Sequence, residues 1–157
     1  MARYRFLTTW LLEAPRQECW DVLQDVLGWP EWWPGVESVD QIDVGDERRV
    51  GSLHRVRWRA RPAYSVELEF LVEEVREPAL MSGRSSDDLE GTGTWRLMEL
   101  DGVTAVLYEW DVRTTREWMN ALAPLARRLF VRNHERIMRQ GGEGLARRLG
   151  VRLLAAS

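Results

Sequence analysis

The segment from Thr115 to about Leu149 limits most strongly how this chain can fold. Apolar residues recur there at steps of three and four, and arginines fill most of the opposite side. This spacing predicts one amphipathic α-helix. Its apolar stripe would consist of Trp118, Leu122, Leu125, Leu129, Asn133, Ile137, Gly141, Leu145 and Leu149. Such a stripe needs an apolar surface to cover, and the strands predicted upstream supply one.

The start and the shape of this helix can also be predicted. Thr114 followed by Glu117 is typical of a capping box, which places the start of the helix there. A straight helix of this span would be roughly 50 Å long, more than the width of a domain of this size. We therefore expect kinks at Pro124 and at the glycine patch of residues 141–144.

Length and charge narrow the class of protein. With 157 residues, 45% of them hydrophobic, and no linker rich in Pro, Gly or Ser, the chain fits one domain spanning residues 1–157. Its 22 basic residues are all Arg and are set against 25 acidic ones, for a net charge of -3. This balance argues against nucleic acid as a partner. The absence of Lys excludes a Schiff-base mechanism.

The cellular context follows from the cysteine count and the N-terminal residues. The single cysteine, Cys19, allows no disulfide within the chain. The opening residues MARYRFLTTWLLEAP show neither a signal peptide nor a membrane span. The default expectation is a cytoplasmic protein without a transmembrane segment.

The residues before the helix predict a run of strands interrupted by two short helices. Alternation of apolar and polar residues predicts strands over 3–13, 52–61, 64–76, 93–100 and 103–114, with weaker candidates at 36–44 and 80–85. Pro15 to Asp25 predicts a short helix. The segment WPEWWPG, Trp29 to Gly35, allows about one helical turn, and its three Trp form either a wedge into the core or an exposed lip.

Two hairpins fix which side chains share a face. In the strands 52–61 and 64–76, odd-numbered Arg and Glu residues should meet as ion pairs on a wet face, and the even-numbered apolar residues on a dry one. Asp101-Gly102 predicts a tight turn in which Leu100 pairs with Val103 and Trp95 with Tyr108. The sum is an α+β helix-grip architecture: a curved antiparallel sheet of six to seven strands wrapped around the C-terminal helix, with two short helices after the first strand.

These residues also carry a resemblance to a known superfamily. The segments LLEAPRQECWDVLQD and WPEWWPGV, the hairpin GTGTWRLMELDGVTAVLYEWDV and the terminal helix resemble the START/Bet v 1-like (SRPBCC) superfamily, in particular bacterial polyketide cyclase/dehydrase-like proteins. The resemblance covers essentially the whole chain. It implies a helix-grip fold with a deep apolar cavity between sheet and helix, which in relatives holds lipids, sterols, polyketides or plant hormones. It implies no shared catalytic residue.

The inner face supplies the candidate ligand-binding residues. Nine Trp in one chain are many, and the large rings on the dry face either leave a gap for a ligand or fill the interior themselves. We expect a ligand to contact Trp10, His54, Trp58, Phe70, Trp95, Tyr108, Trp110, Leu129, Asn133 and Ile137.

Three polar residues on this face are candidates for chemistry. His54 lies on the dry side of its strand, Asn133 interrupts the apolar stripe of the helix, and Tyr108 offers a hydroxyl. Each needs a hydrogen-bond partner, either within the protein or on a ligand. His134, next to Asn133, should lie at the edge of the stripe. Two His far apart and one Cys give no metal-ligand spacing, and Cys19 fits a small core residue better than a nucleophile.

Two classes of function remain open. The first is a non-catalytic protein that binds a hydrophobic small molecule, lipid or polyketide-like, without a cofactor. The second is a polyketide aromatase/cyclase-dehydratase, in which His54 would carry a proton while Tyr108 and Asn133 orient carbonyl groups of a poly-β-ketone. A third hypothesis is an interaction module that uses WPEWWPG as an exposed lip, and a homodimer through an outer strand or this lip is compatible with each.

Overall fold

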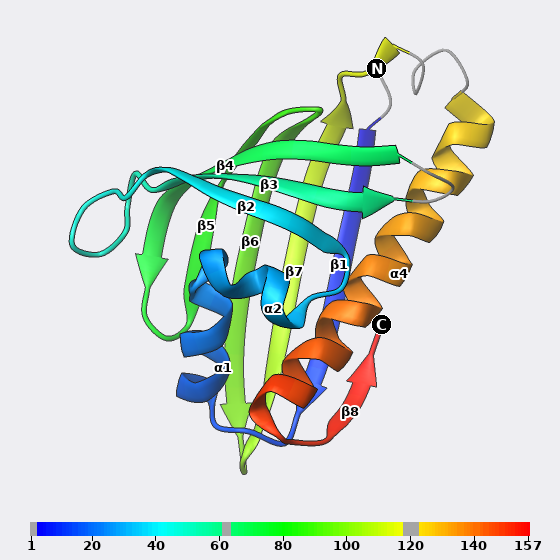
Figure 1. Ribbon diagram of the computed structural model, residues 1–157. Helices are drawn as coiled ribbons and strands as arrows, with labels where there is room; N and C mark the ends of the chain where they lie inside the picture. The colour runs from blue at the N-terminus through cyan, green and yellow to red at the C-terminus, as the bar shows by residue number, and fades with distance from the viewer. Residues whose placement is uncertain (1–2, 61–63, 118–122) are drawn as a thin grey trace.

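One antiparallel sheet curves around a long C-terminal helix, as the sequence predicts (Figure 1). The computed structural model describes residues 3–60, 64–117 and 123–157. Within them the sheet has eight strands, in the spatial order β2 (Val36–Asp43), β3 (Leu53–Ala60), β4 (Tyr64–Arg76), β5 (Leu80–Asp87), β6 (Leu89–Leu100), β7 (Val103–Thr114), β1 (Arg3–Leu12) and β8 (Leu153–Ala156). The helices described are α1 (Arg16–Gln24), the 3-10 turn η1 (Val26–Gly28), α2 (Trp29–Trp32) and α4 (Ala123–Leu149).

The predicted hairpin registers are confirmed. Leu100 pairs with Val103 and Trp95 with Tyr108, around a turn in which Asp101 and Gly102 both have positive φ, 50° and 77°. A turn with two positive φ values is the kind that Asp-Gly favours. On the next hairpin, Arg55 Nη2 lies 2.6 Å from Glu69 Oε1. The charged residues of these strands therefore lie on the convex face, and the even-numbered apolar ones on the concave face.

The Trp segment is a wedge into the core, not an exposed lip. Trp29, Trp32 and Trp33 are 6%, 7% and 0% exposed. The indole N–H of Trp33 donates to the backbone carbonyl of Ile137 at 2.8 Å, and that of Trp29 to Leu23 at the same distance. The wedge thus joins α2 to the middle of α4 by a direct hydrogen bond.

The predicted start of the terminal helix falls at the edge of the described residues. Thr114 is the last residue of β7, and Thr115 donates its hydroxyl to the Asp87 carbonyl at 2.7 Å and its N–H to Asp88 at 3.0 Å. These bonds tie Thr115 to the turn between β5 and β6, and because residues 118–122 lie outside the described residues the expected capping box stays a prediction. Trp118 and Leu122 of the predicted stripe lie outside the described residues. The described helix is about 40 Å long at about 1.5 Å per residue.

The glycines of α4 do not interrupt it. The helix is continuous through residues 141–144. A Cβ added to Gly141 would lie 2.5 Å from the Trp33 ring, and one added to Gly142 would lie 2.9 Å from the Trp10 ring. A Cβ on Gly144 would collide with the Trp32 carbonyl oxygen. Instead of kinking the helix, these glycines let its backbone approach the Trp cluster closely. The kink expected at Pro124 stays a prediction, because the residues one turn before it lie outside the described residues.

The strand β8 has no counterpart in the sequence prediction. It pairs with β1, with Trp10 opposite Ala156 and Leu11 opposite Ala155. Four residues without polar alternation carry too little pattern to be recognised. Among the helices that the structure describes, none is long and apolar enough to cross a membrane.

We expect Gly144→Ala to destabilise the protein, although Ala is the better helix former. In an open helix position the change would stabilise by about 1 kcal/mol. Here the new methyl group would overlap the Trp32 carbonyl oxygen, so the free energy of unfolding should fall by roughly 1–3 kcal/mol. Urea unfolding followed by Trp fluorescence measures the change. Glu143→Ala, at the exposed neighbouring position, is the control and should change stability by less than about 0.5 kcal/mol. A Gly144→Ala protein as stable as the wild type would contradict the packing described.

Candidate functional site: an aromatic pocket under the terminal helix

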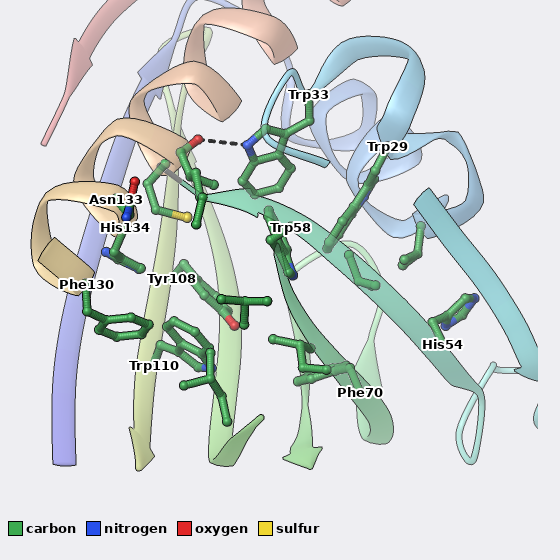
Figure 2. A pocket seen from close by; sticks show the side chains of 18 of the residues that line it. Trp29, Trp33, His54, Trp58, Phe70, Tyr108, Trp110, Phe130, Asn133 and His134 are labelled. Carbon is green, nitrogen blue, oxygen red and sulfur yellow. Dashed lines mark hydrogen bonds between the residues drawn. The ribbon is translucent and has the colours of Figure 1, made fainter. Parts of the chain in front are cut away.

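A pocket lies between the concave face of the sheet and α4 (Figure 2). The described residues that line it come from η1, α2 and its following loop, the strands β3 to β7, and α4. They are Val26, Trp29, Trp33, His54, Val56, Trp58, Ala60, Tyr64, Val66, Leu68, Phe70, Met81, Leu89, Trp95, Tyr108, Trp110, Phe130, Asn133, His134, Ile137 and Met138. On β3 and β4 every second residue faces the pocket, because side chains alternate between the two faces of a strand. None of these residues is Arg, Asp or Glu.

The pocket is narrow. Its volume is about 90 Å³. Pockets for drug-sized ligands measure roughly 300–1,000 Å³, and an apolar cavity of roughly 150 Å³ holds one benzene molecule. Trp58, Phe70, Tyr108 and Trp110 face inward and are only half-buried, so the pocket exposes parts of these rings. The two outcomes expected from the sequence, a gap or a filled interior, are thus combined: a gap exists, and aromatic rings occupy most of the space around it.

Two glycines make room for the rings at the centre of the pocket. Gly83 of β5 and Gly93 of β6 face each other in the ladder. A Cβ on Gly93 would lie 2.8 Å from the Tyr108 hydroxyl and 3.2 Å from the Phe70 ring, and one on Gly83 would lie 3.0 Å from Phe70. A larger residue at position 93 would press on both rings, whereas one at position 83 would also collide with the Leu71 carbonyl oxygen of β4. Gly93 therefore sets how deep Phe70 and Tyr108 lie, and Gly83 keeps β4 and the Phe70 ring close to β5.

Tyr108 is the polar residue at the centre of the pocket. Its ring stacks on Trp95, with centroids 4.2 Å apart and planes at 23°. Its hydroxyl points into the pocket (Figure 2) and has no hydrogen-bond partner among the described residues. Burial raises the pKa of Tyr108 far above its usual value, so the phenol keeps its proton at neutral pH. A neutral phenol can both donate and accept a hydrogen bond.

Asn133 and His134 lie at the α4 end of the pocket. The Asn133 side-chain amide donates to the Tyr64 hydroxyl at 3.2 Å. The His134 ring stacks on Phe6 at 3.8 Å between centroids, and its Nε2 has no hydrogen-bond partner. His134 is 8% exposed, and burial lowers its pKa to about 4. It is therefore a neutral, buried imidazole, more deeply placed than the sequence suggested.

His54 lies at the other end of the pocket. Figure 2 shows it far from Asn133 and His134, next to the strand β2. It is 7% exposed, and burial lowers its pKa although the nearby Asp25 carboxylate opposes that effect. The three residues proposed for chemistry thus line one pocket, but His54 and Asn133 do not meet at a single point in it.

Most of the predicted ligand contacts line the pocket, and two do not. The residues found there are His54, Trp58, Phe70, Trp95, Tyr108, Trp110, Asn133 and Ile137. Trp10 is fully buried behind the pocket, with its ring centroid 5.6 Å from that of Trp95. Leu129 is on α4 but is not among the lining residues.

Several lining residues were not predicted from the sequence. The apolar stripe predicted for α4 ran through Leu129, whereas the helix turns the next residue, Phe130, toward the pocket. Phe130, His134 and Ile137 follow one another at steps of four and three, and they face the pocket together with Met138. Leu125 of the predicted stripe is instead 70% exposed. The helical period of three and four residues fits the predicted stripe and the observed lining residues equally well. Only the contacts of α4 with the sheet determine which of the two faces the pocket.

Cys19 lies in the core, as the sequence predicts. It is fully buried, and burial raises the pKa of its thiol to about 11. The thiolate, which is the nucleophilic form, is therefore scarce at neutral pH. Among the residues that the structure describes, no group of three or more His, Cys, Asp or Glu side chains could hold a metal ion.

The sequence and the fold agree on a family. The chain belongs to the family described as polyketide cyclase / dehydrase and lipid transport, which it matches over residues 5–150. The superfamily inferred from the sequence is confirmed. No curated protein matches the chain.

Several solved structures share the fold. The Zhui aromatase/cyclase from Streptomyces sp. R1128 has a TM-score of 0.74 and 20% identity, with 92% of each chain covered. A START superfamily protein from Mycobacterium smegmatis has a TM-score of 0.74 and 15% identity, covering 92% of this chain and 98% of that one. The di-domain ARO/CYC BexL of the BE-7585A biosynthetic pathway has a TM-score of 0.73 and 18% identity, covering 91% of this chain and 48% of that one. At these identities the similarity establishes the fold alone.

We expect the stability of the protein to fall between pH 7 and pH 4, with His134 as a main cause. In the unfolded chain this imidazole takes up a proton near its usual pKa of 6.5, whereas in the folded protein it resists protonation down to about 4. Acid therefore favours the unfolded state, by up to roughly 3 kcal/mol for this one group. The measurement is urea unfolding at a series of pH values.

His134→Phe is the informative variant, because it keeps a flat ring against Phe6 and cannot titrate. Its loss of stability over the same pH range should be smaller than that of the wild type by up to roughly 3 kcal/mol. His54 titrates in both proteins and cancels in the comparison. Identical pH profiles for the two proteins would show that His134 is not held neutral by burial.

Proposed function

We propose that this protein binds a hydrophobic small molecule in the pocket between the sheet and α4. The observation that carries the proposal is the lining: aromatic and aliphatic side chains from eight elements converge on one space, with few polar atoms among them. Apolar walls with a small number of placed polar groups are typical of small-molecule sites. A lipid or polyketide-like guest and a cytoplasmic site of action are part of the same proposal.

The family and the walls of the pocket each support this proposal. The family's description includes lipid transport, which requires reversible binding of an apolar molecule. The deeply buried and well-connected Trp cluster closes one end of the pocket without filling the other. A molecule that enters would therefore replace contacts with water by contacts with ring surfaces, which favours binding in proportion to the apolar area removed from water.

Because the pocket is small, a guest can bind only if side chains in the pocket wall move. At about 90 Å³ the pocket is smaller than a single aromatic guest needs, so side chains in its wall must move when one enters. Phe70 and Trp110 flank the open space in Figure 2 and are only half-buried, which leaves them freer to move than the fully buried Trp33. The cost of this movement lowers affinity, and it should be relieved by removing one ring.

We expect Phe70→Ala to bind naphthalene at least about tenfold more tightly than the wild type, a gain of about 1.4 kcal/mol. The variant removes a ring from the pocket wall and so makes room for the guest. Trp fluorescence titration reports binding because Trp58, Trp95 and Trp110 line the site. Native mass spectrometry after incubation with a mixed lipid and polyketide extract identifies a natural guest.

The control is Leu71→Ala, on the same strand but on the outer face, where Leu71 is 39% exposed. This variant should bind as the wild type does. Val66→Ala removes less volume from the pocket and serves if Phe70→Ala does not fold. If neither the wild type nor any enlarged variant binds naphthalene or retains a molecule from the extract, the binding proposal fails.

The second candidate function is an aromatase/cyclase acting on a poly-β-ketone. It is favoured by two proteins that share the fold and are named as aromatase/cyclases. His54 would carry a proton, and Tyr108 and Asn133 would orient carbonyl groups. Because His54 and Asn133 lie at opposite ends of the pocket in Figure 2, a substrate would have to extend through its whole length to meet both.

For this second function we expect His54→Ala to abolish cyclised product when the protein is supplied with a poly-β-ketone made by a ketosynthase. Loss of the proton carrier commonly costs about 10²–10⁴-fold in rate. The product is measured by liquid chromatography and mass spectrometry, with Leu71→Ala as the control. Unchanged turnover in His54→Ala would reject the role of His54, and no turnover by the wild type would reject the enzyme.

A further inference from the structure

The walls of the pocket carry no charge, in a protein that is otherwise highly charged. Of all residues, 30% are Asp, Glu or Arg, yet none of the described lining residues is. Along β3 and β4 the Arg and Glu side chains turn outward into ion pairs such as Arg55 with Glu69. An ion inside the pocket would therefore lose its water without gaining a partner of opposite charge, which costs several kcal/mol.

Neither histidine can supply the missing positive charge at neutral pH. Burial lowers the pKa of both His54 and His134, in the latter case to about 4. A cation is no better served. The described walls hold no carboxylate, so a cation would exchange its water for contacts with ring faces alone.

The Tyr108 hydroxyl is open to a guest, and the His54 ring and the indole N–H groups of Trp95 and Trp110 are further polar groups of the lining without a partner among the described residues. The Asn133 amide already donates to Tyr64. The indole N–H of Trp58 and Nε2 of His134 lack partners, but neighbouring atoms cover them. The Tyr108 hydroxyl also lacks a partner among the described residues, and it points into the open space (Figure 2). Gly93 helps to keep it uncovered, since a Cβ there would lie 2.8 Å from the hydroxyl oxygen.

We infer that the pocket selects a neutral, flat ligand with one polar oxygen, and that the Tyr108 hydroxyl donates a hydrogen bond to this oxygen. The inference rests on the proposed function and adds to it the class of ligand and the residue that orients it. A buried hydroxyl without a partner is costly, so a ligand oxygen that reaches it is favoured over a hydrocarbon of the same shape. Carboxylates, and with them fatty acids and other acids, are rejected.

Four compounds of nearly equal size and shape separate these effects. Acetophenone is neutral and carries a carbonyl oxygen, and α-methylstyrene replaces that oxygen by a CH₂ group. Benzoate carries a negative charge and benzamidine a positive one on the same ring. Dissociation constants are measured at pH 7 by ligand-observed NMR titration, with the wild type and with Phe70→Ala as the enlarged pocket.

We expect acetophenone to bind about 3- to 10-fold more tightly than α-methylstyrene, the range for one neutral hydrogen bond, and at least tenfold more tightly than benzoate or benzamidine. Tyr108→Phe should remove the advantage of acetophenone over α-methylstyrene and leave the affinity for α-methylstyrene within about twofold. Tyr4→Phe is the matched control, because it removes a buried hydroxyl without a partner from outside the pocket, and the advantage should persist.

The outcomes are distinct. Benzoate or benzamidine binding as tightly as acetophenone overturns the selection for a neutral ligand, while the proposed binding function stands. An advantage of acetophenone that survives in Tyr108→Phe overturns the role of Tyr108. Failure of all four compounds to bind both the wild type and Phe70→Ala overturns the inference, and failure of naphthalene and the extract as well overturns the binding function.

Discussion

The contact between Trp33 and the glycines of α4 holds this structure together at the point where sheet, short helices and terminal helix meet. Trp33 is fully buried, donates to the Ile137 carbonyl at 2.8 Å, and lies where a Cβ on Gly141 would be. Its ring is also within 5.0 Å of Trp58 and 5.1 Å of Trp29, measured between centroids. Because glycine has no side chain, the helix backbone itself forms part of this core.

The pocket is a consequence of how side-chain size changes along α4. Glycines at positions 141, 142 and 144 bring the C-terminal half of the helix against Trp10, Trp32 and Trp33. In the preceding two turns the helix presents Phe130, His134 and Ile137 instead, and the space left between these side chains and the sheet is the pocket. One half of the helix thus seals the core and the other half covers the site, and neither role depends on a break between them.

The sequence determines the sheet more completely than it determines the helix that covers it. Strand alternation has a period of two, so a single tight turn such as Asp101-Gly102 assigns every side chain of both strands to a face. For this reason the pairing of Trp95 with Tyr108, and their place in the pocket, could be predicted. A helix has a wide apolar face, and its rotation about its own axis is set by tertiary contacts. The sequence therefore placed Leu129 in the site and left out Phe130 and His134.

Other features escaped prediction because they depend on neighbours distant in the chain. The bonds from Thr115 to the carbonyls of Asp87 and Asp88 tie the end of β7 to the turn between β5 and β6, which no local pattern reveals. The glycine patch was predicted to weaken the helix, because Gly has a low helix propensity. In the structure its close packing against Trp33 outweighs the roughly 1 kcal/mol that each glycine costs in a helix. Similarly, the strand alternation at His54 and the helical spacing at Asn133 placed both residues on the inner face, but only the fold shows that they lie at opposite ends of the pocket.

The narrow open space of the pocket and the unpaired Tyr108 hydroxyl are two departures from the packing of an ordinary protein core. A core selected only for stability would fill the space and pair every buried polar group. Here Gly93 leaves room above the sheet, and the Tyr108 hydroxyl beside it has no partner among the described residues. Such local departures from good packing are typical of functional sites, where a ligand completes what the protein leaves open. A small, uncharged pocket with an exposed hydroxyl should bind few compounds but select among them strongly. Few molecules have a shape that fits it, and few of those carry an oxygen where the hydroxyl can reach it.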